Sequence, residues 1–137
     1  MPVNLPTPEK ADLLAVAGIK LGISSAGIKT AGKEDLVLIE LAESTVTSAV
    51  YTQNAFCAAP VTLAKQHQQQ ISPRYLLINS GNANAGTGEA GMQAAQACCQ
   101  SVADLTDAEP TSVLPFSTGV IGQQLPVEKI QAALPAA

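Results

Sequence analysis

A short apolar run sets the first constraint on the fold of this chain. The run is Tyr75-Leu76-Leu77-Ile78, and polar residues bound it on both sides. Continuous apolar runs of this length are typical of a strand that is buried on both faces. We therefore expect a strand over Tyr75–Asn79, with packing layers on each side of it.

A loop and a helix follow this strand in the sequence. Positions 79–88 hold only small or turn-forming residues, several of which tolerate positive φ, so we expect a loop whose backbone can be closely approached. From about Glu89 to Leu105, apolar residues recur at helical spacing. These residues are Met92, Ala95, Cys99 and Val102. Because the face is rich in small side chains, it should pack closely against a sheet.

The segments before the apolar run mix strand and helix patterns. Glycines punctuate the region after Ile19, where we expect a loop or short strands. Leu36–Leu41 and Val46–Thr52 have strand-type compositions on either side of the turn Ala42–Ser44, which predicts a hairpin. Val61–Gln70 predicts a helix, and the proline before it suits the first turn, where no N–H is needed.

The last part of the chain continues this mixture. Thr111–Phe116 predicts a strand, which Pro115 limits to a sheet edge or a strand end. Ser117–Gly122 predicts a sharp turn, and Pro126–Leu134 predicts a short final helix. Strands and helices in this order indicate an α/β fold of the α+β type, built from layers of sheet and helix. At 137 residues the chain has the length of one domain, or of a large piece of one.

Charge and composition exclude several classes of function. Eleven acidic residues oppose seven basic ones, and Lys and Arg are scattered, so we expect no nucleic-acid partner. Three cysteines accompany a single histidine without the spacing of a zinc site, so we expect free thiols and no metal. The first residues lack a secretory pattern and all apolar runs are short. We therefore expect a soluble, cytoplasmic protein with no membrane partner.

Thr118 and Gly119 are the first candidate site residues. Where a strand ends in a glycine turn, a hydroxyl and a free backbone N–H can converge on one point. Two such donors, aimed at a developing oxyanion, stabilise the transition state of acyl transfer by roughly 3 kcal/mol per donor. The alternative is a strand-exit turn in which Thr118 bonds only its own backbone. The residues alone favour the turn.

The Asn-rich segment Asn79–Gly88 is the second candidate. Its Asn amides and exposed N–H groups could bind a carboxylate or order another loop. It is not a phosphate-binding loop, because it lacks the Gly-Lys-Ser/Thr ending and its glycines do not match the dinucleotide spacing. The residues alone favour a structural turn here as well.

Other reactive residue types indicate structure rather than catalysis. His67 lies at a Gln-rich helix end, where we expect a solvated surface residue, so no base is available for a Ser–His or Cys–His dyad. Cys57 has apolar and small neighbours, which favours a buried thiol over an activated thiolate. Glu34-Asp35, Asp104 and Asp107 are expected to act in turns and caps rather than as an acid–base pair.

Several segments together resemble one family. They are Glu40–Glu43, Tyr51–Asn54 with Phe56–Val61, Asn79–Ala85, and Ser117–Gly122. In residues and in order they are similar to the successive amino-terminal motifs of the ornithine acetyltransferase family, also called bifunctional glutamate N-acetyltransferases. The resemblance extends from about Gly18 to the last residue. A single glycine turn would be weak evidence, whereas four motifs in the family's order are strong evidence.

The resemblance implies a fold and a mechanism. The fold is a four-layer αββα sandwich, as in self-processing amino-terminal-nucleophile-like enzymes. The precursor cuts itself before a threonine that becomes the nucleophile of a second chain; this threonine takes acetyl from N-acetylornithine and passes it to glutamate. The positions matching Thr118 and Gly119 supply the oxyanion hole. No cofactor is implied beyond acetyl-coenzyme A as a second acetyl donor, and the implied assembly is a heterotetramer of two alpha and two beta chains.

The chain departs from the family pattern in its extent. Family members continue to the self-cleavage threonine and a second chain, whereas this sequence ends at Ala137 without a threonine in that context. We therefore interpret residues 1–137 as a single partial domain, the amino-terminal portion of the alpha chain, inactive by itself. Two alternatives remain open: a truncated, non-catalytic binding or regulatory module, and a relative of a self-processing aminopeptidase with a similar sandwich.

Overall fold

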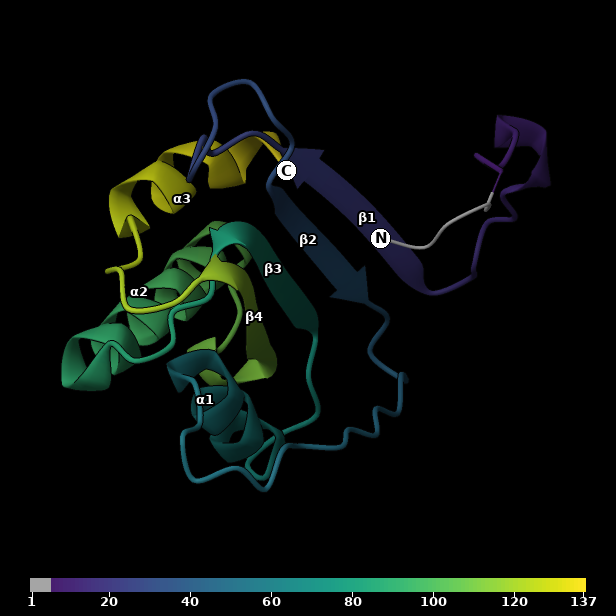
Figure 1. The fold of residues 1–137 in the computed structure, drawn as a ribbon. Helices are drawn as coiled ribbons and strands as arrows, with labels where there is room; N and C mark the ends of the chain where they lie inside the picture. The colour runs from purple at the N-terminus through teal and green to yellow at the C-terminus, as the bar shows by residue number, and fades with distance from the viewer. Residues whose placement is uncertain (1–5) are drawn as a thin grey trace.

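The computed structural model describes residues 6–137, so Met1–Leu5, on which the expectation of no secretory leader partly rests, lie outside the described residues. The elements are β1 (Ile19–Ser24), β2 (Leu36–Leu41), α1 (Ala59–Gln68), β3 (Tyr75–Asn82), α2 (Gly88–Thr106), β4 (Val113–Val120) and α3 (Val127–Ala133), with 3-10 turns at Lys10–Asp12, Pro110–Ser112 and Leu134–Ala136 (Figure 1). Across residues 6–137, no helix is both long and apolar enough to cross a membrane.

The four strands form one sheet in the order β1-β2-β3-β4. The first two pairings are antiparallel, whereas β3 and β4 are parallel. Parallel neighbours need a long crossover, and α2 provides it. Helices α2 and α3 lie on one side of the sheet, and α1 lies against β4 (Figure 1). The result is a helix layer on a sheet layer, a mixed α/β fold as predicted.

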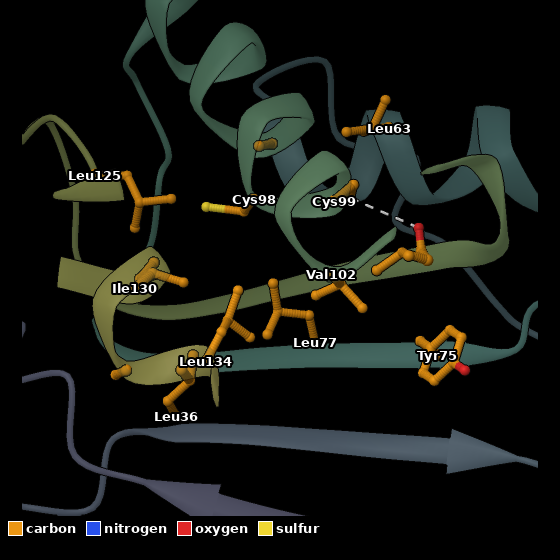
Figure 2. Close-up of a cluster of buried hydrophobic side chains, with 13 residues drawn as sticks. Leu36, Leu63, Tyr75, Leu77, Cys98, Cys99, Val102, Leu125, Ile130 and Leu134 are labelled. Atoms are coloured by element: carbon orange, nitrogen blue, oxygen red, sulfur yellow. Dashed lines mark hydrogen bonds between the residues drawn. The ribbon is translucent and has the colours of Figure 1, made fainter. Parts of the chain in front are cut away.

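The main core lies between α2, α3 and the sheet. Leu77 points from β3 toward Val102 of α2, whereas Leu36 of β2 lies beside Leu134 (Figure 2). Ile130 of α3 and Leu134 close the cluster from the carboxy-terminal segment. All five side chains are buried. Burial of a side chain of this size stabilises the fold by about 1.5–3 kcal/mol relative to an exposed one. The predicted helix with a small-residue face is confirmed, since Ala95 and Cys99 of α2 are buried in this core.

The opposite face of the sheet is apolar but largely uncovered. Ile19, Leu21 and Ile23 of β1 are 43%, 66% and 48% exposed. On β3, burial alternates along the strand, with Leu76 and Ile78 only half-buried. The prediction that this strand is buried on both faces is therefore wrong for the residues described, because helices cover one face only.

The predicted hairpin pairs the wrong segments. Residues 46–52 form no strand, and the antiparallel partner of β2 is β1, with Leu21 opposite Ile39. Strand-type composition expresses how well residues fit a packed, pleated surface, and Val46 and Val50 have almost nothing packed against them, being 91% and 99% exposed. The expectation of a short strand after Ile19 is confirmed by β1.

The other predicted elements are present with small shifts in their ends. The helix expected at Val61–Gln70 is α1, and the final helix is α3 followed by a 3-10 turn. Pro115 lies in β4, which among the strands of residues 6–137 pairs only with β3, so the edge position expected for a strand containing proline is confirmed. The prediction that a sharp turn begins at Ser117 is wrong, because β4 continues to Val120 and the chain turns only after it.

Candidate functional site

Thr118 lies near the end of the edge strand β4, on the face of the sheet away from α2. Side chains alternate along a strand, and the preceding residue, Ser117, points toward the helix side, where its Oγ donates to Asn79 Oδ1 at 2.6 Å. Thr118 therefore points to the opposite face, and it is exposed. The hydroxyl does not point into packed interior, which is a condition for any role at a site.

A mostly apolar cavity of about 430 Å³ borders Thr118. One wall is the extended segment Ala49–Thr52, and the other walls come from α1, from Ile78 of β3 and from residues 114–118 of β4. Tyr51 is fixed in this wall, because its hydroxyl donates to Gln68 Oε1 at 2.6 Å. The structure thus brings the hydroxyl of Thr118 to the side of an apolar space, where a small acyl group could be excluded from water.

Gly119 occupies a position that only glycine can occupy without strain. Its φ is +133°, a value that L side chains rarely adopt. A β-carbon on Gly119 would also lie 2.7 Å from both the carbonyl oxygen of Gly81 and the amide nitrogen of Asn82. The register between β3 and β4 shifts here, at Gly81 and Asn82. Close backbone approach and positive φ together explain why glycine follows Thr118 at this strand end.

The Asn-rich segment is less open than the sequence suggests. Strand β3 continues through it to Asn82, and Asn79, Asn82 and Asn84 are all buried. Their side-chain amides bond to the chain itself; Asn84 Nδ2, for example, donates to Gly91 O at 2.8 Å. These amides are therefore occupied and do not offer a carboxylate site. The structural interpretation of this segment is the one that its geometry supports.

His67 is not the solvated surface residue that the sequence predicts. It is 7% exposed and its Nδ1 lies 2.8 Å from the carbonyl oxygen of Val113. The Gln-rich composition is misleading, because Leu63 and His67 are four residues apart on the buried face of α1. The imidazole ties α1 to the start of β4, far along the strand from Thr118.

Cys57 is also placed differently from the prediction, since it is exposed rather than buried. All three cysteines are free, as expected, and Cys98 and Cys99 are buried. Burial raises the pKa of Cys98 to about 12, with Glu128 adding to the rise, and burial raises the pKa of Cys99 to about 12, with Cys98 adding to it. Neither Cys98 nor Cys99 therefore has the environment of a nucleophile.

Asp35 acts in a turn, as the sequence predicts, but its extent of burial could not be anticipated. It is 6% exposed, and its two carboxylate oxygens accept from the backbone N–H groups of Ala26 and Ile28, both at 2.7 Å. The loop between β1 and β2 is thereby held close to Gly81, where Lys29 and Ile28 lie next to the glycine. No sequence motif marked this arrangement.

Known proteins resemble this chain in sequence and in structure. "Arginine biosynthesis bifunctional protein ArgJ" of Methylococcus capsulatus is 57% identical over 125 residues, which cover 91% of this chain and 30% of that protein. The protein of the same name from Pseudomonas syringae pv. tomato is 58% identical over 122 residues, covering 89% and 30%. The chain thus spans about 30% of the length of these relatives.

Two crystal structures share the fold. The arginine biosynthesis bifunctional protein of Bacillus halodurans matches with a TM-score of 0.79 and 30% identity, covering 85% of this chain and 61% of that one. An ornithine acetyltransferase of Mycobacterium tuberculosis, solved with ornithine, matches with a TM-score of 0.77 and 34% identity, covering 86% and 64%. The ArgJ family profile matches residues 20–137. The resemblance inferred from four motifs is confirmed: the chain belongs to the ArgJ family.

Proposed function

We propose that this chain is the amino-terminal part of an acetyltransferase of arginine biosynthesis, acting in the cytoplasm on N-acetylornithine and glutamate. The observation that carries the proposal is the exposed Thr118 hydroxyl beside the apolar cavity, in a chain whose relatives bear the name of a bifunctional arginine-biosynthesis protein. Acetyl-coenzyme A is a further acetyl donor to test, and no other cofactor is part of the proposal.

In this proposal, Thr118 and Gly119 form the oxyanion hole. A threonine of a second chain attacks the acetyl carbonyl carbon of N-acetylornithine, and the carbonyl oxygen becomes negative. The hydroxyl of Thr118 and the N–H of Gly119 donate to that oxygen. The C–N bond then breaks, and the amine of ornithine leaves with the proton that the threonine hydroxyl gave up. In the second half, the amine of glutamate attacks the acetyl ester, the ester C–O bond breaks, and the threonine oxygen takes up the proton that this amine loses.

The uncovered sheet face supports the proposed second chain. Leu21 and Ile23 of β1 are exposed, and their partners on β2, Ile39 and Val37, are only half-buried. The incompletely covered apolar face therefore continues from β1 onto β2, although Leu41, opposite Ile19, is buried. An apolar face of this kind marks a packing surface. We propose that the sheet of the beta chain packs on it and completes an αββα sandwich, in an assembly of two alpha and two beta chains.

A chimera tests the proposal. Residues 1–137 are joined to the remainder of the Methylococcus capsulatus relative, and acetylglutamate formation from N-acetylornithine and glutamate is measured. Thr118→Ala should lower the rate by about a hundredfold or more, as removal of one oxyanion donor does. Thr118→Ser, which keeps a hydroxyl, should retain most of the activity. Equal rates for Thr118→Ala and the parent chimera would remove the assignment.

The isolated chain provides a second measurement. Residues 1–137 alone should form no acetylglutamate from the same substrates, because the nucleophile is proposed to lie on the second chain. Product formed by the isolated chain, at a rate that scales with its concentration, would contradict the proposed division of the site.

A further inference from the structure

Three buried asparagines surround the strand end that carries Thr118 and Gly119. Asn79 and Asn82 are each 4% exposed and Asn84 is fully buried. A buried amide costs free energy unless its donors and acceptors are bonded. Among the described residues, no buried side-chain nitrogen or oxygen lacks a partner. Each buried amide nitrogen and oxygen thus has at least one partner inside the protein, and these bonds show which parts of the chain the amides hold in place.

Asn79 connects β3 to the residue just before Thr118. Its Oδ1 accepts from Ser117 Oγ at 2.6 Å, and its Nδ2 donates to the carbonyl oxygen of Asn82 at 2.9 Å. The amide of Asn79 therefore links Ser117 of β4 to Asn82 of β3, where the register of the two strands shifts. Because Ser117 is bonded toward the helix side, the alternation of side chains directs Thr118 to the opposite face.

Asn82 holds the chain that follows Gly119. Its Nδ2 donates to the carbonyl oxygens of Gln123 and Gln124, at 3.2 and 3.1 Å, while its Oδ1 accepts from the backbone N–H of Asn84 at 2.7 Å. Two backbone bonds act with it, from Ala83 N to Val120 O at 2.9 Å and from Gly122 N to Ala85 O at 2.8 Å. The strand end is consequently fixed on both sides of the Thr-Gly pair.

We propose that Asn79 and Asn82 are positioning residues that fix the rotation of β4 at Thr118–Gly119. This inference rests on the proposed oxyanion hole. A glycine at φ +133° has no side chain to limit its backbone, so the direction of its N–H depends on how the neighbouring residues are held. The amides supply that constraint, since they bond Ser117 before the pair and residues 123–124 after it.

A pair of matched serine variants in the chimera tests the inference. Ser117→Ala removes the hydrogen bond to Asn79. The control, Ser112→Ala, removes a hydrogen bond of the same length, which Ser112 Oγ donates to Glu109 O at 2.6 Å. Ser112 lies just before the first residue of β4, at the end of the strand away from Thr118. Ser117→Ala should lower kcat about tenfold with KM within about twofold, because the oxyanion donors lose alignment while substrate binding is kept. Ser112→Ala should lower the melting temperature to a similar extent and leave kcat unchanged.

Two further variants sharpen the result. Ser117→Thr keeps the hydroxyl and should restore kcat. Asn79→Ala removes the same bond from the other side, so the double variant with Ser117→Ala should be no slower than the slower single variant. If Ser117→Ala loses no more kcat than Ser112→Ala while Thr118→Ala is inactive, the positioning role is wrong and the oxyanion hole stands. If Thr118→Ala is as active as the parent, the proposed function itself fails, and the inference fails with it.

Discussion

Gly119 packs against the backbone of Gly81, so closely that neither strand leaves space for a β-carbon at Gly119. Both glycines have positive φ, +133° at Gly119 and +101° at Gly81. The contact lies where the register of β3 and β4 shifts. The backbones of β3 and β4 thus meet at the proposed oxyanion donor. The effect of disturbing this contact can be measured as a change in the free energy of unfolding.

Gly119→Ala should destabilise the chain more than Gly122→Ala. Both glycines have positive φ, which costs an alanine of order 1–3 kcal/mol, but only Gly119 has backbone atoms within reach of a new β-carbon. The free energies of unfolding from urea titration provide the comparison. Equal losses of unfolding free energy in the two variants would show that the backbone near Gly81 moves to accept the new β-carbon without destabilising the chain.

His67→Ala should destabilise the chain, because it removes a buried ring and one of the partners of Val113 O. The loss should be about 2–4 kcal/mol, from a cavity and a lost hydrogen bond together. Gln66→Ala, at the exposed neighbouring position on α1, is the matched control and should change stability by less than about 0.5 kcal/mol. Similar urea midpoints for the two variants would contradict the burial of His67 and favour the solvated surface position that the sequence predicts.

Asp35→Ala should loosen the loop between β1 and β2. The amides of Ala26 and Ile28 lose the carboxylate that accepts from them, so their protection against hydrogen exchange should fall by the equivalent of roughly 1–3 kcal/mol. Glu34→Ala, the exposed neighbour, should leave both amides protected. Unaltered exchange in Asp35→Ala would mean that other contacts hold this loop.

The three cysteines should differ sharply in reactivity. At pH 8 a thiol reagent should label Cys57 in the native chain and all three cysteines in urea, because Cys98 and Cys99 are buried and their pKa values are raised to about 12. Cys57→Ser should abolish labelling of the native chain. Rapid labelling of a second thiol in native Cys57→Ser would contradict the burial of the pair.

The same pKa values predict a decline of stability in alkali. The folded state keeps its two thiol protons above pH 9, where the unfolded state releases them, so the unfolded state binds fewer protons in this range. The free energy of unfolding should therefore fall as the pH rises from about 9 to about 12. The double variant Cys98→Ala and Cys99→Ala should lose this component, although it will be less stable at neutral pH.

The sequence predicts best where local pattern and final packing coincide. Helix α2 was predictable because its small residues recur at helical spacing, and Ala95, Cys99 and Val102 of that face are buried in the core. The pairing of β2 was not, because Lys20 and Gly22 weaken the strand pattern of β1, whereas the more strand-like Val46–Thr52 finds no partner in the described chain. Strand pairing depends on contacts remote in sequence, which composition does not express.

The candidate site divides in the same way. The sequence motif indicated Thr118 and Gly119 as candidate residues, and the predicted strand end at Phe116 lies four residues before the end of β4 at Val120. Their surroundings were not foreseen, because the bonds of Asn79 and Asn82 depend on a register shift between two strands joined by a long helix. His67 shows a related limit, because its neighbours in the sequence are polar, yet its side chain is buried on the packed face of α1.

The parallel pairing of β3 with β4 through α2 has a practical consequence. It gathers the asparagine amides, their acceptors and the Thr-Gly pair into one uninterrupted stretch, residues 75–124. A single gene segment therefore encodes the whole arrangement. Recombination between homologous genes with crossover points outside this stretch would transfer it intact, whereas a crossover inside α2 would join amides from one parent to a strand end from the other.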